Sequence, residues 1–393
     1  MAMTAPTQRG PDTDPQEVAS PGRPRLAHLD VVRVGLTLLV VAHHVAMVYG
    51  AAGLGFYFVD LPPEIVSRGL LIFVLTNQAW FMGAFFLVAG YFTPASFDRK
   101  GATPFLRSRV IRLGIPLAVF VVILNPVAVT GWFFVHDLLG PLTWDTYEYT
   151  DYLRMGPTWF LALLLIFSLG YAAWRQFVGE QRAAWVLPGA ATIAAFVVAL
   201  AATSFVWRMY IEVGEEKWGF PSLAYLPQYA SLFVVGAVAA RSEWFDRLPG
   251  RTAIAGFVAA VGAWILLFPL AFSGEMFSLE LTESVSRAFG GGTWRSAVYA
   301  VWDATLAVGL VLALIVGLRT LVRSQGTVTR FLAQHSLTVY LLHIPVIVYV
   351  AVAFRDIDIS RPLKILIVGV VATAISFALA WAIRRIPGAR RVL

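Results

Sequence analysis

The chain has 393 residues, of which 59% are hydrophobic and only 13% are charged, and its mean hydropathy is +0.73. Soluble proteins carry about 25% charged residues, so this chain lacks the polar surface that a water-soluble fold requires. The absence of cysteine excludes disulfides, iron–sulfur clusters and thiolate nucleophiles. We therefore predict an all-α integral membrane protein, because helices satisfy their own backbone hydrogen bonds in lipid.

The N-terminal segment differs from the rest of the chain. Residues 1–24 are polar and rich in proline, without apolar periodicity, and we predict that they form a disordered cytoplasmic tail. A cleaved signal peptide is not indicated, because the first apolar run starts only near Leu29 and contains two histidines. Residues 25–393 are predicted to form a single polytopic membrane domain.

Apolar runs long enough to cross a bilayer recur along this domain and predict about ten transmembrane helices. Pro116 and Pro126 interrupt the third run, and the fifth is also less regular than the others. The runs lie at about 29–50, 66–92, 109–135, 157–177, 184–206, 222–240, 252–273, 295–318, 336–353 and 361–383.

The basic residues between these runs predict the orientation of the chain. With the N-terminus in the cytoplasm, twenty Lys and Arg fall in inner segments and nine in outer segments, and Arg33 lies within the first run. This excess is what the positive-inside rule requires of a plasma-membrane protein with both termini in the cytoplasm. The net charge of +7 is therefore interpreted as an orientation signal and not as a nucleic-acid surface.

The first run contains three residues that are costly inside a bilayer and therefore candidates for function, Arg33, His43 and His44. Arg33 and His44 are eleven residues apart, which places them about 20° from a common helix face and about 16 Å apart along the axis. His43 points about 100° away from His44, so we do not expect the two histidines to share one role. Asp30 is close enough to pair with Arg33. The alternative is a snorkelling arginine and a hydrogen-bonded, buried histidine.

A second candidate cluster lies at the start of the third run, where Arg107, Arg109 and Arg112 occur close together in the sequence. Arginine forks suit phosphate groups, so this cluster is a candidate phosphate site. The alternative is positive-inside charge that contacts lipid headgroups.

Later spans carry further polar residues. Ser336, Tyr340 and His343 share one face of the ninth span, at spacings i, i+4 and i+7, which indicates either a site or a polar helix–helix contact. Asp303 lies in the middle of the eighth span and is a candidate partner for a buried histidine or for Arg33. The histidines inside the spans have no carboxylate at metal-ligand spacing, so no metal site is predicted.

The outer segment 142–159 combines tryptophan, tyrosine and acidic residues. Flat aromatic faces with neighbouring carboxylates suit sugars, whereas an interfacial aromatic belt explains the same residues without a ligand.

Several stretches, taken in order, resemble the acyltransferase family 3 membrane proteins, especially the branch of the glucans biosynthesis protein C type. The Arg-x10-His spacing of the first span (Arg33 and His44) and the Arg-x-x-Arg at the third (Arg109 and Arg112) are the family's marks. The matching stretches are HLDVVR…HH at 28–44, WFMGAFFLVAGYFTP at 80–94, SFDRKGATPFLRSRVIRLGIPL at 96–117, GPTWFLALLLIF at 156–167 and SLTVYLLHIPVIV at 336–348.

The resemblance implies a membrane O-acyltransferase that moves an acyl group from cytoplasmic acyl-CoA, a cosubstrate and not a bound cofactor, to a hydroxyl of an extracytoplasmic glycan or other acceptor. His44 would act as general base or form an acyl-imidazole, and Arg33 would orient the donor or stabilise developing charge. Arg109 and Arg112, with Arg107, would bind the phosphates of CoA. The supporting residues would be His43, Asp303, Ser336, Tyr340 and His343.

Two other functions compete with this one. A proton-coupled secondary transporter or flippase would use the same buried Asp and His as a proton relay, and a membrane scaffold would use them only for folding. Many relatives carry a fused soluble domain, and we expect this chain to have none. The ten-helix core would then act alone or with a partner protein. The stretch 273–294 contains none of these matching motifs and is a candidate contact for the acceptor.

Overall fold

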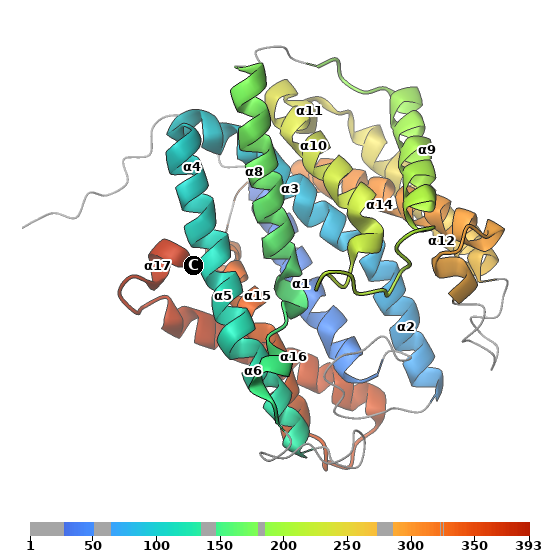
Figure 1. Ribbon diagram of the computed structural model, residues 1–393. Helices are drawn as coiled ribbons and strands as arrows, with labels where there is room; N and C mark the ends of the chain where they lie inside the picture. Colours follow the sequence, from blue (N-terminus) through green and yellow to red (C-terminus); the bar gives the residue numbers. More distant parts are fainter. Residues whose placement is uncertain are drawn as a thin grey trace, which may run out of the picture.

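The computed structural model describes residues 27–50, 64–134, 147–179, 185–272, 286–322, 324 and 326–393. Within these residues the chain is helical, and ten helical segments are long and apolar enough to cross a membrane (Figure 1). Each coincides with one of the ten predicted runs, so that part of the prediction is confirmed. The predicted tail at 1–24 and most of the 273–294 stretch lie outside the described residues.

The helices that build the bundle have the following bounds. They are α1 (Ala27–Val48), α2 (Glu64–Gln78), α3 (Phe81–Lys100), α4 (Ala102–Arg109), α5 (Ile115–Val119), α6 (Asn125–Val129), α8 (Trp159–Val178), α9 (Ala190–Trp207), α10 (Leu226–Ser242), α11 (Trp244–Arg247), α12 (Gly250–Ala271), α14 (Trp294–Leu321), α15 (Thr327–Ala353), α16 (Arg361–Ile383) and α17 (Ala389–Val392).

Two of the spans are broken, each for a local reason. In the third span, π-helical turns at Val110–Gly114 and Phe120–Leu124 alternate with α5 and α6. Each of these short α-helices has proline at its first or second position, because proline has no N–H to continue the ladder of the preceding turn. The second span breaks between α2 and α3, where Gln228 donates a hydrogen bond to the carbonyl oxygen of Ala79 (2.7 Å).

Connections between spans gather alternately at two opposite ends of the bundle. At one end Val213 N–H donates to Phe289 O (3.0 Å), which joins the connections after α9 and α12. At the other end Arg319 donates to the carbonyl oxygens of Phe245 (2.5 Å) and Leu248 (2.7 Å). We call the first the aromatic end (residues 130–134, 147–158, 208–222 and 286–294) and the second the basic end (residues 97–112, 241–251 and 384–393).

Two spans cross closely because glycine removes the side chain at the contact. A Cβ atom at Gly90 of α3 would lie 2.0 Å from Phe233 O, and one at Gly236 of α10 would lie 2.1 Å from Leu87 O. Small residues at such contacts let helix backbones approach in lipid, where van der Waals packing drives association. The α3–α10 contact fixes the start of α10, which adjoins the cavity described next.

Candidate functional site

A cavity of about 440 Å³ opens at the aromatic end of the bundle. Its walls come from α1, the α2–α3 break, α6, the loops 152–157 and 213–225, and α15. The polar and aromatic groups that line it include His43, His44, Gln78, Tyr152, Tyr225 and Tyr340. A site assembled from distant segments of the chain is typical of small-molecule binding.

His44 lies on the cavity wall with a second histidine directly behind it. Nε2 of His343, on α15, is 3.2 Å from Nδ1 of His44, and the two rings meet edge to face with centroids 4.7 Å apart. His44 Nδ1 is also 2.9 Å from the carbonyl oxygen of Val40, and His343 Nδ1 is 2.6 Å from that of Tyr340. The structure thus brings together two of the predicted residues that lie 299 positions apart in the chain.

These contacts assign the protons of the neutral histidine pair. A carbonyl oxygen only accepts, so Nδ1 carries the proton in both rings. His343 Nε2 then accepts the hydrogen bond from His44 Nδ1–H. The lone pair of His44 remains on Nε2, which makes no hydrogen bond to any residue that the structure describes. His44, which lines the cavity, therefore keeps one ring nitrogen that can accept a proton.

His43 also lines the cavity, although it lies about 100° around α1 from His44. Its ring stacks on Phe81 (centroids 5.1 Å apart), and its Nδ1 accepts from the side-chain amide of Asn77 (3.3 Å). His43 Nε2 therefore holds the proton and can donate. Both histidines line the cavity, but their ring contacts differ, and whether they have different roles, as predicted, stays a prediction.

The predicted polar face of α15 divides into two parts. Tyr340 lines the cavity and donates a hydrogen bond to Pro157 O, with its ring 5.8 Å from that of His343. Ser336 instead donates to Leu332 O one turn earlier (2.9 Å) and does not line the cavity. The structure therefore groups Tyr340 with the histidine pair and leaves Ser336 in contact with its own helix.

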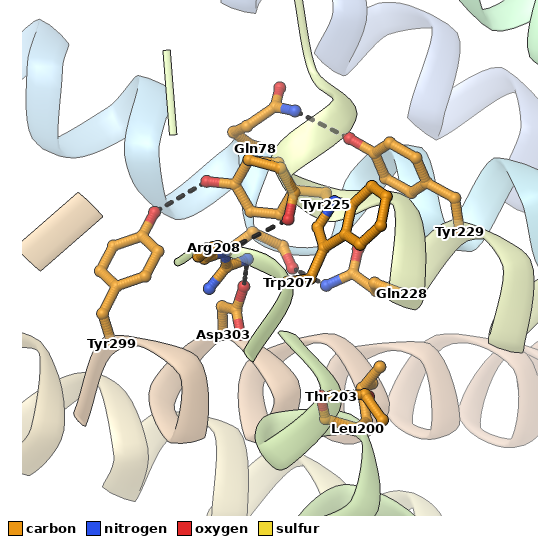
Figure 2. Close-up of polar contacts among 12 residues, drawn as sticks. Gln78, Leu200, Thr203, Trp207, Arg208, Tyr225, Gln228, Tyr229, Tyr299 and Asp303 are labelled. Atoms are coloured by element: carbon orange, nitrogen blue, oxygen red, sulfur yellow. Dashed lines mark hydrogen bonds and ion pairs between the residues drawn. The ribbon is translucent and has the colours of Figure 1, made fainter. Parts of the chain in front are cut away.

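The partner of Asp303 is Arg208, which directly follows α9. Figure 2 shows the carboxylate of Asp303 pointing at the guanidinium of Arg208, and the two side chains form a buried ion pair, 1% and 0% exposed. The guanidinium also lies over the rings of Tyr225 and Tyr299, 4.7 and 5.2 Å from their centroids. Asp303 thus pairs with neither a histidine nor Arg33, the partners considered from the sequence.

This ion pair supports one wall of the cavity. Arg208 Nε donates to Ala224 O (3.3 Å), and the indole of Trp207 donates to Leu223 O (2.7 Å). Both bonds hold the segment just before α10, and Ser222 and Tyr225 of this segment line the cavity.

The other side of the same wall is held by Gln78, which donates to Ser222 Oγ (3.3 Å) and to Tyr229 Oη (3.0 Å). Sequence analysis missed Gln78 and Arg208. Arg208 follows an apolar run directly and was counted with the outer-loop charges, and no local signal marks it as buried.

The predicted donor-side residues lie away from the cavity, nearer the basic end. Arg33 pairs with Asp30 (3.2 Å), as predicted, and stands eleven residues before His44, about 16 Å along the helix. Arg109 is half-buried beside Phe105 (5.0 Å) and within 3.4 Å of Thr93 Oγ1, whereas Arg107 and Arg112 are exposed. None of these arginines lines the cavity.

The predicted aromatic acceptor segment lies at the mouth of the cavity in part. Tyr152, Arg154 and Trp159 line it, together with Glu216 of the loop after α9, whereas residues 142–146 lie outside the described residues. Within the part of the chain that the structure describes, no group of three His, Asp or Glu side chains has metal-binding geometry.

Comparison with known proteins fits this architecture. No curated protein and no solved structure matches the chain. The acyltransferase domain of acyltransferase family 3 matches residues 26–381, which include nine of the described spans, nearly all of the tenth, the histidine pair and the cavity. The chain therefore belongs to the acyltransferase family 3 membrane proteins.

Proposed function

We propose that the protein transfers an acyl group from cytoplasmic acyl-CoA to a hydroxyl group of an extracytoplasmic acceptor, a glycan or another sugar. The observation that carries this proposal is the cavity at the aromatic end, which is lined by His44 together with several aromatic side chains. Family membership supports acyl transfer, and the predicted orientation places this end outside the cytoplasm.

His44 would act as the general base. As the acceptor oxygen attacks the thioester carbonyl, its proton passes to His44 Nε2, and His343 Nε2 stabilises the resulting imidazolium through the bond to Nδ1–H. The new C–O bond forms, the C–S bond breaks, and the proton on Nε2 passes to the departing sulfur to give CoA thiol. In this proposal His43, which also lines the cavity, would donate from Nε2–H to the oxyanion.

The acceptor would bind against the aromatic lining. Trp132, Tyr152, Trp159 and Tyr225 offer flat faces, and Glu216 at the mouth offers a carboxylate that accepts from sugar hydroxyls. An alcohol bound there lies beside His44 and is screened from bulk water. A carbohydrate therefore suits this lining better than a purely apolar acceptor does.

The donor would approach from the other end of α1. In this proposal Arg109, Arg112 and Arg107 bind the phosphates of CoA, and Arg33 orients the arm that carries the thioester. That arm has to cover the distance from Arg33 to His44, about 16 Å along the helix. The charged part of the donor would stay at the basic end, and only its uncharged arm would enter the bundle.

The test measures transfer of label from acetyl-CoA and succinyl-CoA to envelope glycans by purified protein in liposomes. We expect His44→Ala to lose about a hundredfold or more in rate, the usual contribution of a general base. His335→Ala, on α15, is the control, because His335 bonds a carbonyl oxygen of its own helix, as His44 does, yet does not line the cavity.

Two outcomes would count against the proposal. Undiminished transfer by a correctly folded His44→Ala protein would move the chemistry away from α1. Failure of the wild type to bind CoA or transfer label from any donor would favour proton-coupled transport, with His44 and His343 as the relay.

A further inference from the structure

The C-terminal helix folds back onto the basic end of the bundle. α17 follows a turn after α16 and packs against the π-helical turn Val110–Gly114 at the start of the third span (Figure 1). Arg390 Nε donates to Arg384 O (2.9 Å), and Arg384 Nη1 donates to Leu393 O (2.5 Å). These bonds fix the two arginines beside a segment that lies more than 270 positions earlier in the sequence.

The fold thereby gathers positive charges from three segments. The pKa of the Arg384 guanidinium is lowered, first by burial and then by the charges of Arg390 and Arg112. Lys100, at the end of α3, lies within electrostatic range of Arg109 and Arg112. From the sequence alone, the C-terminal arginines are interpreted only as orientation signals. In the structure they lie beside the arginine cluster at the start of the third span.

These charges differ from others at the same end in having no Asp or Glu partner among the described residues, and Arg384 bonds the main-chain oxygen of Leu393, the last residue. Arg175 and Arg241 each bond Asp98 at 3.1 Å. Among the described residues, no Asp or Glu side chain forms an ion pair with any member of the cluster, and the buried Nε of Arg109 has no hydrogen-bond partner. Arg175 and Arg241 therefore have a counterion and are not counted in the cluster. The members of the cluster are Lys100, Arg107, Arg109, Arg112, Arg384 and Arg390.

A bound anion would relieve the repulsion among these positive charges. The arrangement of the guanidinium groups indicates which chemical class of anion binds there. Guanidinium groups bind phosphate through paired N–H donors, and several of them around one junction of helices suit a ligand with more than one phosphate. Two sources supply such groups at a membrane surface, the headgroup of an anionic lipid and a phosphorylated substrate. CoA carries a diphosphate and a separate 3′-phosphate, so it matches a cluster whose members come from separate segments of the chain.

We propose that Arg384 and Arg390 complete, together with Arg109 and Arg112, a phosphate-binding site for the CoA moiety of the donor. This inference rests on the proposed acyl-CoA-dependent function. It adds a binding element from the end of the chain to the one predicted at the third span. The last turn of the protein therefore takes part in substrate binding as well as in membrane orientation.

The experiment measures binding of CoA and of 3′-dephospho-CoA by calorimetry, with the protein in nanodiscs of neutral lipid. For Arg384→Ala/Arg390→Ala we expect the Kd for CoA to rise about tenfold to a hundredfold, the loss of two charge-assisted contacts. Arg390→Ala alone, which removes an exposed side chain and leaves Arg384 in place, is expected to raise Kd about fivefold. Arg251→Ala, an exposed arginine at the start of α12 on the same end, is the matched control and is expected to change nothing.

If the variants lose affinity for CoA but not for 3′-dephospho-CoA, the arginines bind the 3′-phosphate. If they lose affinity equally for both ligands, the arginines bind the diphosphate. Unchanged CoA affinity in both variants, with normal binding by the wild type, would overturn the inference and leave the proposed function intact. The inference also fails if the variants differ from the wild type only in nanodiscs of anionic lipid, since the cluster then binds headgroups. If the wild type itself does not bind CoA, the proposed function fails first.

Discussion

The ion pair between Arg208 and Asp303 allows a quantitative test of how the cavity wall is held. Both side chains are almost completely excluded from solvent. Asp303→Leu leaves the guanidinium charge without its counterion, and breaking a buried pair in this way costs about 3–5 kcal/mol. The rings of Tyr225 and Tyr299 do not offset this loss, because they already contact Arg208 in the wild type. We therefore expect the free energy of unfolding to fall by that amount.

The double variant Arg208→Met/Asp303→Leu should behave differently. Arg208 Nη1 and Asp303 Oδ1 have no hydrogen-bond partner among the described residues, so the pair is incompletely satisfied in the wild type. Replacing both charges by apolar side chains removes the desolvation cost of each, and such replacements are often neutral. We expect the double variant to recover most of the lost stability.

Function should not recover with stability. The double variant still lacks the bond from Arg208 Nε to Ala224 O, which holds the wall carrying Ser222 and Tyr225. We expect the KM for the acceptor to rise while the KM for the donor stays unchanged. Unfolding in detergent, followed by tryptophan fluorescence, measures the stability of each variant. Steady-state transfer measures the two KM values. If the stability lost by the single variants Arg208→Met and Asp303→Leu simply adds up in the double variant, the two charges are not coupled and the reasoning is refuted.

Three further changes test separate parts of the structure. Gly236→Ala places a Cβ 2.1 Å from a carbonyl of α3 and should cost at least about 1–3 kcal/mol of stability, whereas Gly35→Ala meets nothing within 4 Å and should not; thermal unfolding compares the two. His343→Gln should lower kcat about tenfold to a hundredfold at unchanged donor KM, because it disturbs the group that orients His44; equal kcat would exclude this role. Tyr340→Phe removes one hydrogen bond and should cost about 1 kcal/mol in chemical unfolding; no change would show that this bond does not stabilise the fold.

The spans were predictable because hydropathy reports directly on burial in lipid. Their ends were less so, since helices continue beyond the apolar core. α3 runs on to Lys100 past the predicted end near 92, and α15 begins at Thr327 instead of near 336. Both extensions are polar and helical, a combination that a search for apolar runs does not detect.

The site was predictable only within single helices. Periodicity placed Tyr340 and His343 on a common face, and the structure keeps them together. It did not provide the pairing of His343 with His44, or of Asp303 with Arg208, because these contacts join helices that are far apart in the chain. Helical spacing fixes the direction of a side chain about its own axis, whereas the identity of its partner depends on how the spans pack.

The arrangement of charge along the bundle is compatible with the proposed transfer of an acyl group across the membrane. The cluster around Arg109 and Arg384 lies at the basic end, the ion pair of Arg208 and Asp303 is neutral as a unit, and the cavity wall presents histidines. Moving a charge into the interior costs several kcal/mol, so a donor whose phosphates stay with Arg109 and Arg384 avoids that cost. Only the uncharged thioester then has to reach His44, and the imidazole that meets it becomes charged only while the reaction proceeds.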